Sequence, residues 1–441
     1  MKVVIVGGGS GGTACAFELR KLNKDVDITI IEKNNYLYYS PCAIPYVLTG
    51  EIKNIRDIFL FKESDYKNNR INIMLNCEVF DIDSDKKKVF YSKKGKKESI
   101  EYDKLVIATG ASNLTPQVEG IEKTEYFTLK DIDDAKKILK NIKKGSVSAV
   151  IGAGIVGMEL AVCLRKRGEK VFILEEKEHI LPNMLDKTIS NFVKQYLEKE
   201  GIKIYEGKKI KKIKENNLII GERKIKFDKL FICTGNKPNI EIAKKAHLEI
   251  NKAILVNEFL ETSKKDIYAC GDSVEFFEFN TNEKIVSGLG TTAVRQARVI
   301  AKNILGGKEK FNPIMNNSIA KIGNLYVGSV GLTEKRAIYL GKRVFAADYC
   351  SNVRAEYYPS KEKIIVRIVG DEKGSIIGGQ IAGESEVVGR LDLLALAIQN
   401  KNHLSEIENL ETCYNPPSSP IFEPLSIVAG LCIKKILLNN N

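Results

Sequence analysis

The sequence predicts an α/β fold with two Rossmann-like dinucleotide-binding domains and a C-terminal α+β domain. Two glycine-rich fingerprints predict the first part, because each follows a buried-strand pattern and precedes a helix, a second strand and an acidic residue. A change of pattern predicts the rest: from about residue 311 the chain reads as short β runs with helices after them.

The first fingerprint opens the chain. Residues 2–6 read as a buried strand, a helix is expected through Arg20, and a second strand over 28–31 ends at Glu32. Three glycines have the spacing that this motif requires: Gly7, Gly9 and Gly12. Glycines let the backbone approach a pyrophosphate, the helix N-terminus faces its negative charge, and the acid accepts ribose hydroxyls. The complete set disfavours a plain glycine-rich turn.

The second fingerprint repeats this arrangement. A strand over 148–151 precedes the glycines, and a strand over 171–174 leads to Glu175. The glycines are Gly152, Gly154 and Gly157. Two complete fingerprints imply two different dinucleotides. The carboxylate of Glu175 would bind a ribose diol and repel a 2′-phosphate, and no arginine directly follows it, so NADH is favoured over NADPH at this site.

Length and composition indicate a soluble protein of several domains. At 441 residues, the chain is long enough for more than one domain of roughly 100–200 residues. Its apolar content is 44%, and no apolar run reaches the roughly 18 residues that a membrane span needs. Met1 leads directly into the first strand, so we expect no signal peptide and a cytoplasmic location.

Charge and cysteine usage narrow the class. The formal net charge is +13, but the lysines are interleaved with glutamates and accompany no nucleic-acid motif. This indicates a lysine-rich surface that attracts anionic substrates, and no nucleic-acid partner is expected. The nine cysteines lack paired short spacings, which argues against a disulfide framework and a zinc site. We therefore expect no metal centre, and most cysteines should be small buried residues.

Strand endings and glycines set the expected domain boundaries. Strands ending in Thr109-Gly110 and in Thr234-Gly235 close two similarly built segments. A further buried strand ends in Gly271-Asp272 and leads to a helix that should re-enter the first domain. We expect the first dinucleotide-binding domain over 1–112, the second over 113–240, the return to the first over 241–310 and the C-terminal domain over 311–441.

A single cysteine motif indicates redox chemistry at sulfur. Cys42 stands in Ser40-Pro41-Cys42-Ala43-Ile44-Pro45-Tyr46, ten residues after Glu32, and two dinucleotide sites would serve this one thiol. The alternative is a buried structural cysteine, as we expect for Cys15 and Cys163. The proline-flanked motif disfavours that alternative.

Together these motifs resemble the pyridine nucleotide-disulfide oxidoreductase family, in its single-cysteine branch of coenzyme A-disulfide reductases, NADH oxidases and peroxidases, and polysulfide or persulfide reductases. The resemblance covers essentially the whole chain. It implies FAD at the first fingerprint, with Thr109-Gly110 and Gly271-Asp272 as further flavin motifs. It also implies a nicotinamide nucleotide at the second fingerprint, with Glu159 near the nicotinamide, and a homodimer formed by the C-terminal domain.

One position separates this chain from the two-cysteine branch of the family. Two-cysteine reductases carry a second cysteine five positions after the first, and here that position is Val47. The resemblance therefore implies that Cys42 stores its oxidising equivalent as a mixed disulfide, a persulfide or a sulfenic acid.

Two tyrosines are the candidate acids. The two-cysteine enzymes use a C-terminal His-Pro pair, whereas this chain has a segment similar to the Tyr-Ala-Pro-Pro of coenzyme A-disulfide reductases, with Asn415 in the alanine's place. Tyr414 is then the candidate acid, because a phenol stays protonated at neutral pH and can stabilise a departing thiolate; the alternative is a packed interface aromatic. Tyr358 is the preferred second family tyrosine.

The resemblance favours a flavoenzyme that uses NADH to reduce a small disulfide, coenzyme A disulfide above all. Ser40, Arg20 and Lys21 are candidate substrate contacts, although basic residues at a helix end also complement the helix dipole.

Three alternatives stay open. The first two are an NADH oxidase and a polysulfide or persulfide reductase. Oxidases and peroxidases of the family carry a histidine in the first glycine loop, which here reads Gly9-Ser10-Gly11-Gly12. Outside enzymes, the alternative is a flavin-bearing nucleic-acid-binding or sensor protein with a basic surface.

Overall fold

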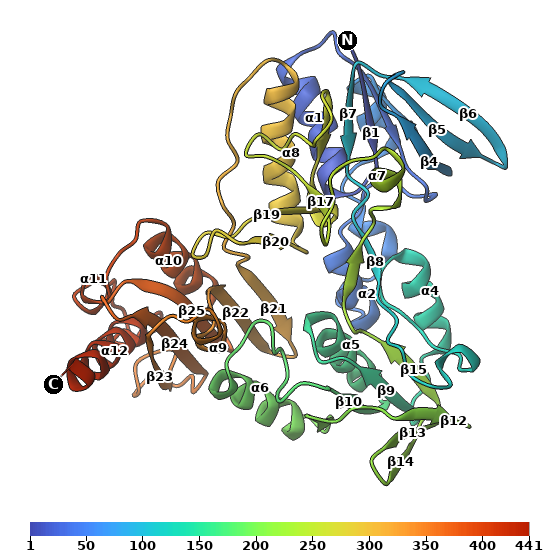
Figure 1. The fold of residues 1–441 in the computed structure, drawn as a ribbon. Helices are drawn as coiled ribbons and strands as arrows, with labels where there is room; N and C mark the ends of the chain where they lie inside the picture. Colours follow the sequence, from blue (N-terminus) through green and yellow to red (C-terminus); the bar gives the residue numbers. More distant parts are fainter. Residues whose placement is uncertain (441) are drawn as a thin grey trace. The chain divides into compact units, whose positions relative to one another are not determined.

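The computed structural model describes residues 1–440 and falls into two compact units, each made of two stretches of chain (Figure 1). The first unit comprises residues 1–113 and 236–316. The second comprises residues 114–235 and the chain from 317 onward. This division places the segment with the second fingerprint in one unit with the C-terminal segment, and the three domain boundaries expected from the sequence stay predictions.

A five-stranded parallel sheet forms the centre of the first unit, in the order β18-β7-β1-β2-β3. Its strands are mainly apolar and buried, as expected of parallel strands that are covered on both faces, except the edge strand β3, in which only Ile71 is buried. Helix α1 (Ser10–Leu22) follows β1, and α8 (Gly290–Ile304) lies beside α1 (Figure 1). The strands are β1 Lys2–Val6, β2 Asp27–Ile31, β3 Ile71–Met74, β7 Lys104–Ile107 and β18 Ile267–Ala269.

Shorter elements complete the first unit. One antiparallel sheet is formed by β4 Cys77–Asp83, β5 Lys88–Lys93 and β6 Lys96–Glu101. In a second small sheet, β19 Val274–Phe277 pairs with β20 Lys284–Val286 in antiparallel and with β17 Ile254–Leu255 in parallel. An antiparallel pair is formed by β8 Ala111–Asn113 and β16 Asn236–Pro238. The short helices are η1 Pro41–Ala43, α2 Ile44–Thr49, η2 Ile55–Ile58, α3 Glu63–Asn68, α7 Glu241–Lys245 and η4 Gly271–Ser273.

The second unit begins with a parallel sheet in the order β11-β10-β9-β15. Its strands are β9 Val147–Ile151, β10 Lys170–Leu174, β11 Lys203–Tyr205 and β15 Lys229–Ile232. Its helices are η3 Ile121–Lys123, α4 Ile132–Asn141, α5 Ile155–Lys166 and α6 Lys187–Lys199. A small antiparallel sheet is formed by β12 Lys212–Lys214, β13 Asn217–Ile220 and β14 Arg223–Lys226.

The C-terminal part of the second unit is an antiparallel sheet in the order β21-β22-β25-β24-β23. Its five strands account for the short β runs expected from about residue 311. These are β21 Ser318–Ile322, β22 Leu325–Gly331, β23 Val344–Asn352, β24 Lys363–Asp371 and β25 Ile376–Gly383. The helices are α9 Glu334–Tyr339, α10 Val388–Gln399, α11 Leu404–Glu408 and α12 Pro424–Asn440.

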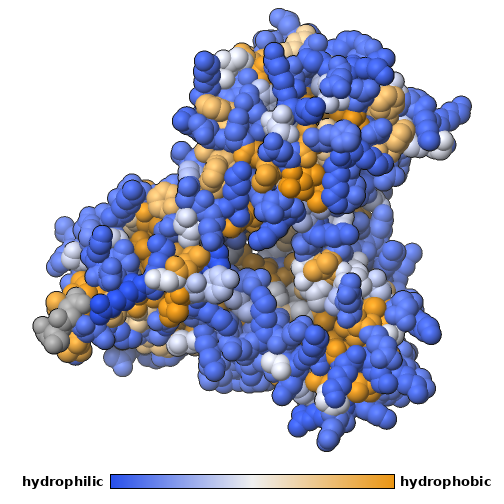
Figure 2. Space-filling model, in the orientation of Figure 1, coloured by the Kyte–Doolittle hydropathy of each residue, from blue (hydrophilic) through white to orange (hydrophobic). Residues whose placement is uncertain are grey.

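In Figure 2, hydrophilic residues cover most of the face in view, and apolar residues form separate groups among them. Across residues 1–440, none of the helices combines the length and the apolar character that crossing a membrane would require.

Asp186 is a buried carboxylate that joins the two parts of the second unit. It precedes α6 and is 6% exposed. Its Oδ2 accepts hydrogen bonds from the backbone N–H of Glu334 at 2.9 Å and from the side-chain amide of Gln380 at 2.6 Å. Its Oδ1 accepts one from the backbone N–H of Lys335 at 3.1 Å. Because these donors belong to α9 and β25, the carboxylate ties the start of α6 to the C-terminal part.

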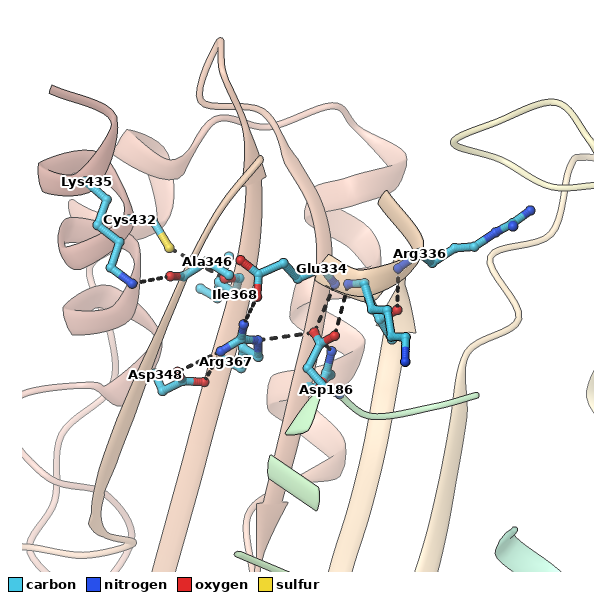
Figure 3. Close-up of polar contacts among 12 residues, drawn as sticks. Asp186, Glu334, Arg336, Ala346, Asp348, Arg367, Ile368, Cys432 and Lys435 are labelled. Carbon is cyan, nitrogen blue, oxygen red and sulfur yellow. Dashed lines mark hydrogen bonds and ion pairs between the residues drawn. The ribbon is translucent and has the colours of Figure 1, made fainter. Parts of the chain in front are cut away.

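Arg367 on β24 completes this cluster (Figure 3). Its guanidinium donates to Asp186 at 3.2 Å, to both carboxylate oxygens of Asp348 at 2.6 Å, and to Glu334. The arginine is 5% exposed. Removal of the arginine would leave the buried Asp186 and the partly buried Asp348 and Glu334 without their cation.

Candidate active site

The first glycine loop has the shape of a pyrophosphate cradle. Gly7 has φ +108°, and a Cβ there would lie 2.2 Å from the carbonyl oxygen of Ala108. A Cβ on Gly12 would lie 1.9 Å from the carbonyl oxygen of Gly7, whereas one on Gly9 would meet nothing within 4 Å. The first and third glycines are therefore required by packing within the protein. The second faces open space, where the backbone can approach a ligand.

Glu32 is held beside this loop. Its Oε2 accepts a hydrogen bond from the N–H of Gly8, and its Oε1 accepts one from the N–H of Asn34, both at 2.7 Å. Two donors fix the orientation of the carboxylate at the end of β2. Each oxygen keeps a further lone pair that can accept from a hydroxyl. The loop and the carboxylate together fit a dinucleotide with ribose hydroxyls.

The second glycine loop reproduces this geometry. A Cβ on Gly152 would lie 2.4 Å from the carbonyl oxygen of Cys233, and one on Gly157 would lie 2.1 Å from the carbonyl oxygen of Gly152. A Cβ on Gly154 would meet nothing within 4 Å. The same division between packing and open space therefore holds in both units.

Glu175 takes the place of Glu32 in the second unit. Its carboxylate accepts hydrogen bonds from the N–H of Ala153 and of Lys177, both at 2.9 Å. These contacts match those of Glu32 in position and number. The second cradle is therefore also suited to a dinucleotide with a ribose diol.

The two further flavin motifs have partners that the sequence did not reveal. Asn239 donates to the carbonyl of Thr109 and accepts from its hydroxyl, both at 2.8 Å, and its N–H donates to the carbonyl of Gly110 at 2.9 Å. The N–H of Gly271 donates to Gln296 at 2.8 Å. The sequence does contain a signal for the partner of Gly271, because Gln296 lies on the buried face of the helix that follows Gly288-Leu289-Gly290.

These motifs meet in one region of the first unit. A Cβ on Gly11 would lie 2.9 Å from the sulfur of Cys270, and one on Gly290 would lie 3.5 Å from the hydroxyl of Ser10. The first loop thus adjoins η4, which carries Asp272, and the start of α8. The structure brings the residues predicted for FAD together, while their individual roles stay predictions.

Glu159 lies in α5, within the helix that follows the second loop. Burial raises the pKa of its carboxyl from 4.5 to about 7. A carboxyl that titrates near neutrality is able to change charge when the environment of its helix changes. Its predicted place near the nicotinamide stays a prediction.

Glu159→Gln is expected to stabilise the protein at pH 8 and to have little effect on stability at pH 5. The folded state holds this proton more tightly than the unfolded state, so the carboxyl lowers the unfolding free energy progressively as the pH rises from 4.5 through about 7. At about 1.4 kcal/mol per pKa unit, a gain of about 1–3 kcal/mol is expected at pH 8. Urea unfolding at both pH values measures it, and an equal effect at the two values would contradict it.

Cys42 lies in η1, directly before α2, and is exposed in the chain. Ser40 donates its N–H to the carbonyl of Ile58 at 2.9 Å, which fixes the start of this turn. Buried cysteines differ: burial raises the pKa of Cys270 and Cys432 to about 12. Since the thiolate is the nucleophile, the exposed Cys42 is better suited to react than these buried thiols.

Arg20 does not have the geometry of a substrate contact. Its five guanidinium N–H groups donate to backbone carbonyls at Asn69, Asn23, Lys24, Val26 and Arg70. These bonds join the end of α1 to the turns before β2 and β3, and none of the donors is left for a phosphate. The sequence left both roles open, because a basic residue at a helix end fits a substrate contact and a structural role equally well. Lys21 is exposed and lies 3.9 Å from Glu18.

Two tyrosine hydroxyls form a pair in the second unit. The hydroxyls of Tyr357 and Tyr414 lie 2.7 Å apart, and this hydrogen bond raises the pKa of Tyr414. The phenols are 73% and 44% exposed. Tyr358 was the tyrosine expected beside Tyr414, but the tyrosine that the structure brings to Tyr414 is its neighbour Tyr357. The two positions are adjacent in an irregular segment, so only the fold decides which hydroxyl reaches Tyr414.

The described part of the chain contains no side-chain cluster suited to binding a metal ion. Over residues 1–440, histidine, cysteine and acidic side chains form no cluster of three or more that could hold an ion.

Comparison with known proteins gives a consistent result along the chain. Residues 1–297 match the family described as pyridine nucleotide-disulphide oxidoreductase. Residues 318–424 match the dimerisation domain of the same family. The predicted fold class, two Rossmann-like domains with a C-terminal α+β dimerisation domain, is confirmed.

Three similar proteins represent three chemistries. An NADH oxidase from Methanocaldococcus jannaschii is 40% identical, with 99% of each chain covered. A coenzyme A disulfide reductase from Staphylococcus aureus is 28% identical, with 95% of this chain and 96% of the relative covered. The structure of a NAD-dependent persulfide reductase from A. fulgidus aligns with a TM-score of 0.95 at 32% identity, covering 99% of this chain and 83% of that one.

Proposed function

Because the chain belongs to the pyridine nucleotide-disulphide oxidoreductase family, whose members are FAD-dependent, we propose that it uses NADH to reduce a low-molecular-weight disulfide through Cys42. The substrate we favour is coenzyme A disulfide. This choice rests on the hydrogen-bonded pair of exposed hydroxyls, Tyr357 and Tyr414, because a phenol is a suitable proton donor to a departing thiolate. The coenzyme A disulfide reductase of Staphylococcus aureus supports it as a relative along nearly the whole chain.

The two cradles would hold the two cofactors. FAD would lie on the loop from Gly7 to Gly12 with its ribose at Glu32, and NADH on the loop from Gly152 to Gly157 with its ribose at Glu175. When bound, FAD supplies the relay between a hydride donor and a sulfur acceptor. NADH is favoured over NADPH because the fixed carboxylate of Glu175 would face a 2′-phosphate.

The chain's own residues would carry out the sulfur chemistry. The Cys42 thiolate attacks one sulfur of the substrate disulfide, which forms a mixed disulfide and breaks the original S–S bond. Tyr414 donates a proton to the departing thiolate, and the hydrogen bond to Tyr357 holds the Tyr414 hydroxyl in place. Two electrons from NADH then cleave the mixed disulfide, which returns the Cys42 thiolate and releases the second thiol. One disulfide, one NADH and one proton thus give two thiols and NAD⁺.

A homodimer would complete this site. Cys42 belongs to the first unit and the two tyrosines to the second, and the match to the family's dimerisation domain supports association of two copies. We propose that each Cys42 works with Tyr414 of the partner subunit. The Pro416-Pro417 pair after the tyrosine restricts the backbone there, which suits a fixed donor better than a mobile tail.

NADH oxidase is the second candidate function. The relative from Methanocaldococcus jannaschii that carries this name is 40% identical to the chain. Against it, the first glycine loop has Ser10 where the family's oxidases and peroxidases were expected to carry a histidine. The persulfide reductase structure keeps reduction of persulfide or polysulfide as a variant of the same thiol chemistry.

One preparation assayed with three acceptors separates these functions. Turnover of NADH is measured with coenzyme A disulfide, with polysulfide and with oxygen, for the natural chain and for Tyr414→Phe. The proposal predicts that coenzyme A disulfide gives the highest kcat/KM and that Tyr414→Phe lowers this value by about 10–100-fold, as expected for loss of a general acid. A higher kcat/KM with oxygen, unaffected by Tyr414→Phe, would favour the oxidase.

A further inference from the structure

The segment that carries Tyr414 is irregular, yet it is anchored at defined points. It connects α11 to α12, and its turn is closed by the N–H groups of Ser418 and Ser419, which donate to the carbonyl of Asn415 at 2.8 and 3.0 Å. Farther along, Glu423 forms a two-point ion pair with Arg390 at 2.6 and 2.8 Å. These contacts shape the turn and hold its far end, but they do not connect it to Tyr357.

Arg354 makes that connection. Its Nε donates to the carbonyl of Pro417 at 2.7 Å, so it reaches the Tyr414 segment directly. Its Nη1 donates to the hydroxyl of Ser360 at 3.2 Å and to the carboxylate of Glu362. One planar guanidinium therefore spans the Tyr414 segment and the segment that carries Tyr357.

The segment of Tyr357 is itself a closed loop. Val353 donates its N–H to the carbonyl of Glu362 at 2.9 Å, which joins the two ends of the loop. The carboxylate of Glu362 also accepts from the hydroxyl of Ser385 at 2.6 Å, next to the end of β25. Arg354 thus fastens the Tyr414 segment to a loop that is already fixed to the C-terminal sheet.

We infer that Arg354 is a positioning residue for Tyr414: by holding the carbonyl of Pro417, it keeps the Tyr414 hydroxyl within hydrogen-bond distance of Tyr357. The inference rests on the proposed function, in which Tyr414 is the proton donor. The two tyrosines are well exposed, so their own 2.7 Å contact competes with water and is not sufficient to fix two segments. Arg354 is better shielded from water than the tyrosines, since its side chain is 19% exposed.

The test is a double-mutant cycle on the FAD-loaded enzyme, with kcat and KM for coenzyme A disulfide measured in Arg354→Gln, Tyr414→Phe and the double variant. Arg354→Gln is expected to lower kcat and kcat/KM alike by about tenfold, because misplacement of a catalytic group acts in the transition state. In the Tyr414→Phe background the same change is expected to cost less than about twofold, since the residue it acts through is gone. Equal losses in both backgrounds would overturn the inference.

Two further variants serve as controls for the effect of Arg354→Gln. Arg354→Lys keeps the positive charge beside Glu362, so it can be measured even if Arg354→Gln fails to fold. One ammonium cannot make all the hydrogen bonds of the planar guanidinium, so we expect a loss of kcat that is smaller than in Arg354→Gln and depends on Tyr414 in the same way. Lys361→Gln removes a bond from Lys361 to the carbonyl of Glu356 inside the same loop and should leave kcat unchanged. A loss in Lys361→Gln equal to that in Arg354→Gln would overturn the inference. Failure of the proposed function is distinct, since it would appear as full activity of Tyr414→Phe or of Cys42→Ser.

Discussion

Cys42→Ser is expected to lower kcat for disulfide reduction by at least about 10³-fold, because a serine hydroxyl cannot form the mixed disulfide. Reduction of the bound flavin by NADH should persist, since that step involves the second cradle and not the thiol. Stopped-flow absorbance measures the flavin step, and steady-state thiol release measures the whole cycle. The pair of results separates loss of the sulfur chemistry from loss of the fold.

Matched controls exist for this prediction. Cys350 and Cys413 are also exposed, and Cys413 directly precedes Tyr414. Cys350→Ser and Cys413→Ser should keep turnover close to that of the natural chain. Undiminished disulfide reduction in Cys42→Ser, or loss in one of the controls instead, would remove Cys42 from the mechanism.

Arg367→Met is expected to lower the free energy of unfolding by about 3–5 kcal/mol at pH 7, because it leaves one buried and two partly buried carboxylates without their cation. The carboxylates are Asp186, Asp348 and Glu334, and the arginine that they surround is 5% exposed. Urea unfolding at fixed FAD concentration measures the loss.

An exposed ion pair provides the comparison. Lys302 donates to Glu309 at 2.5 Å, but their side chains are 43% and 44% exposed. Lys302→Met should therefore change the unfolding free energy by less than about 1 kcal/mol. Similar effects of the two substitutions would mean that the buried cluster contributes no more than a surface pair.

The parts of the site that the sequence predicted are those encoded over a short stretch. Each glycine loop is built from one strand, one turn and one helix, so its spacing already contains its geometry. The same holds for Glu32 and Glu175, which follow the next strand of each unit. The family and the fold class followed from these short motifs and are confirmed.

The parts that could not be predicted depend on distant or ambiguous partners. Asn239 reaches Thr109 across 130 positions, and Arg367 reaches Asp186 across 181. Arg20 looked like a phosphate contact because nothing near it in sequence revealed the carbonyls that surround it. Tyr358 was preferred to its neighbour because adjacent side chains in an irregular segment point in directions that only the packed structure determines.

Mass spectrometry of the FAD-loaded protein tests directly whether Cys42 forms a mixed disulfide with coenzyme A. The protein is incubated with coenzyme A disulfide in the absence of a reductant, digested, and examined for covalently bound coenzyme A before and after addition of NADH. We expect one coenzyme A per chain on the peptide that contains Cys42, and we expect it to be released as the thiol when NADH is added. Absence of the adduct, its presence only on Cys350 or Cys413, or its persistence with NADH would contradict the account.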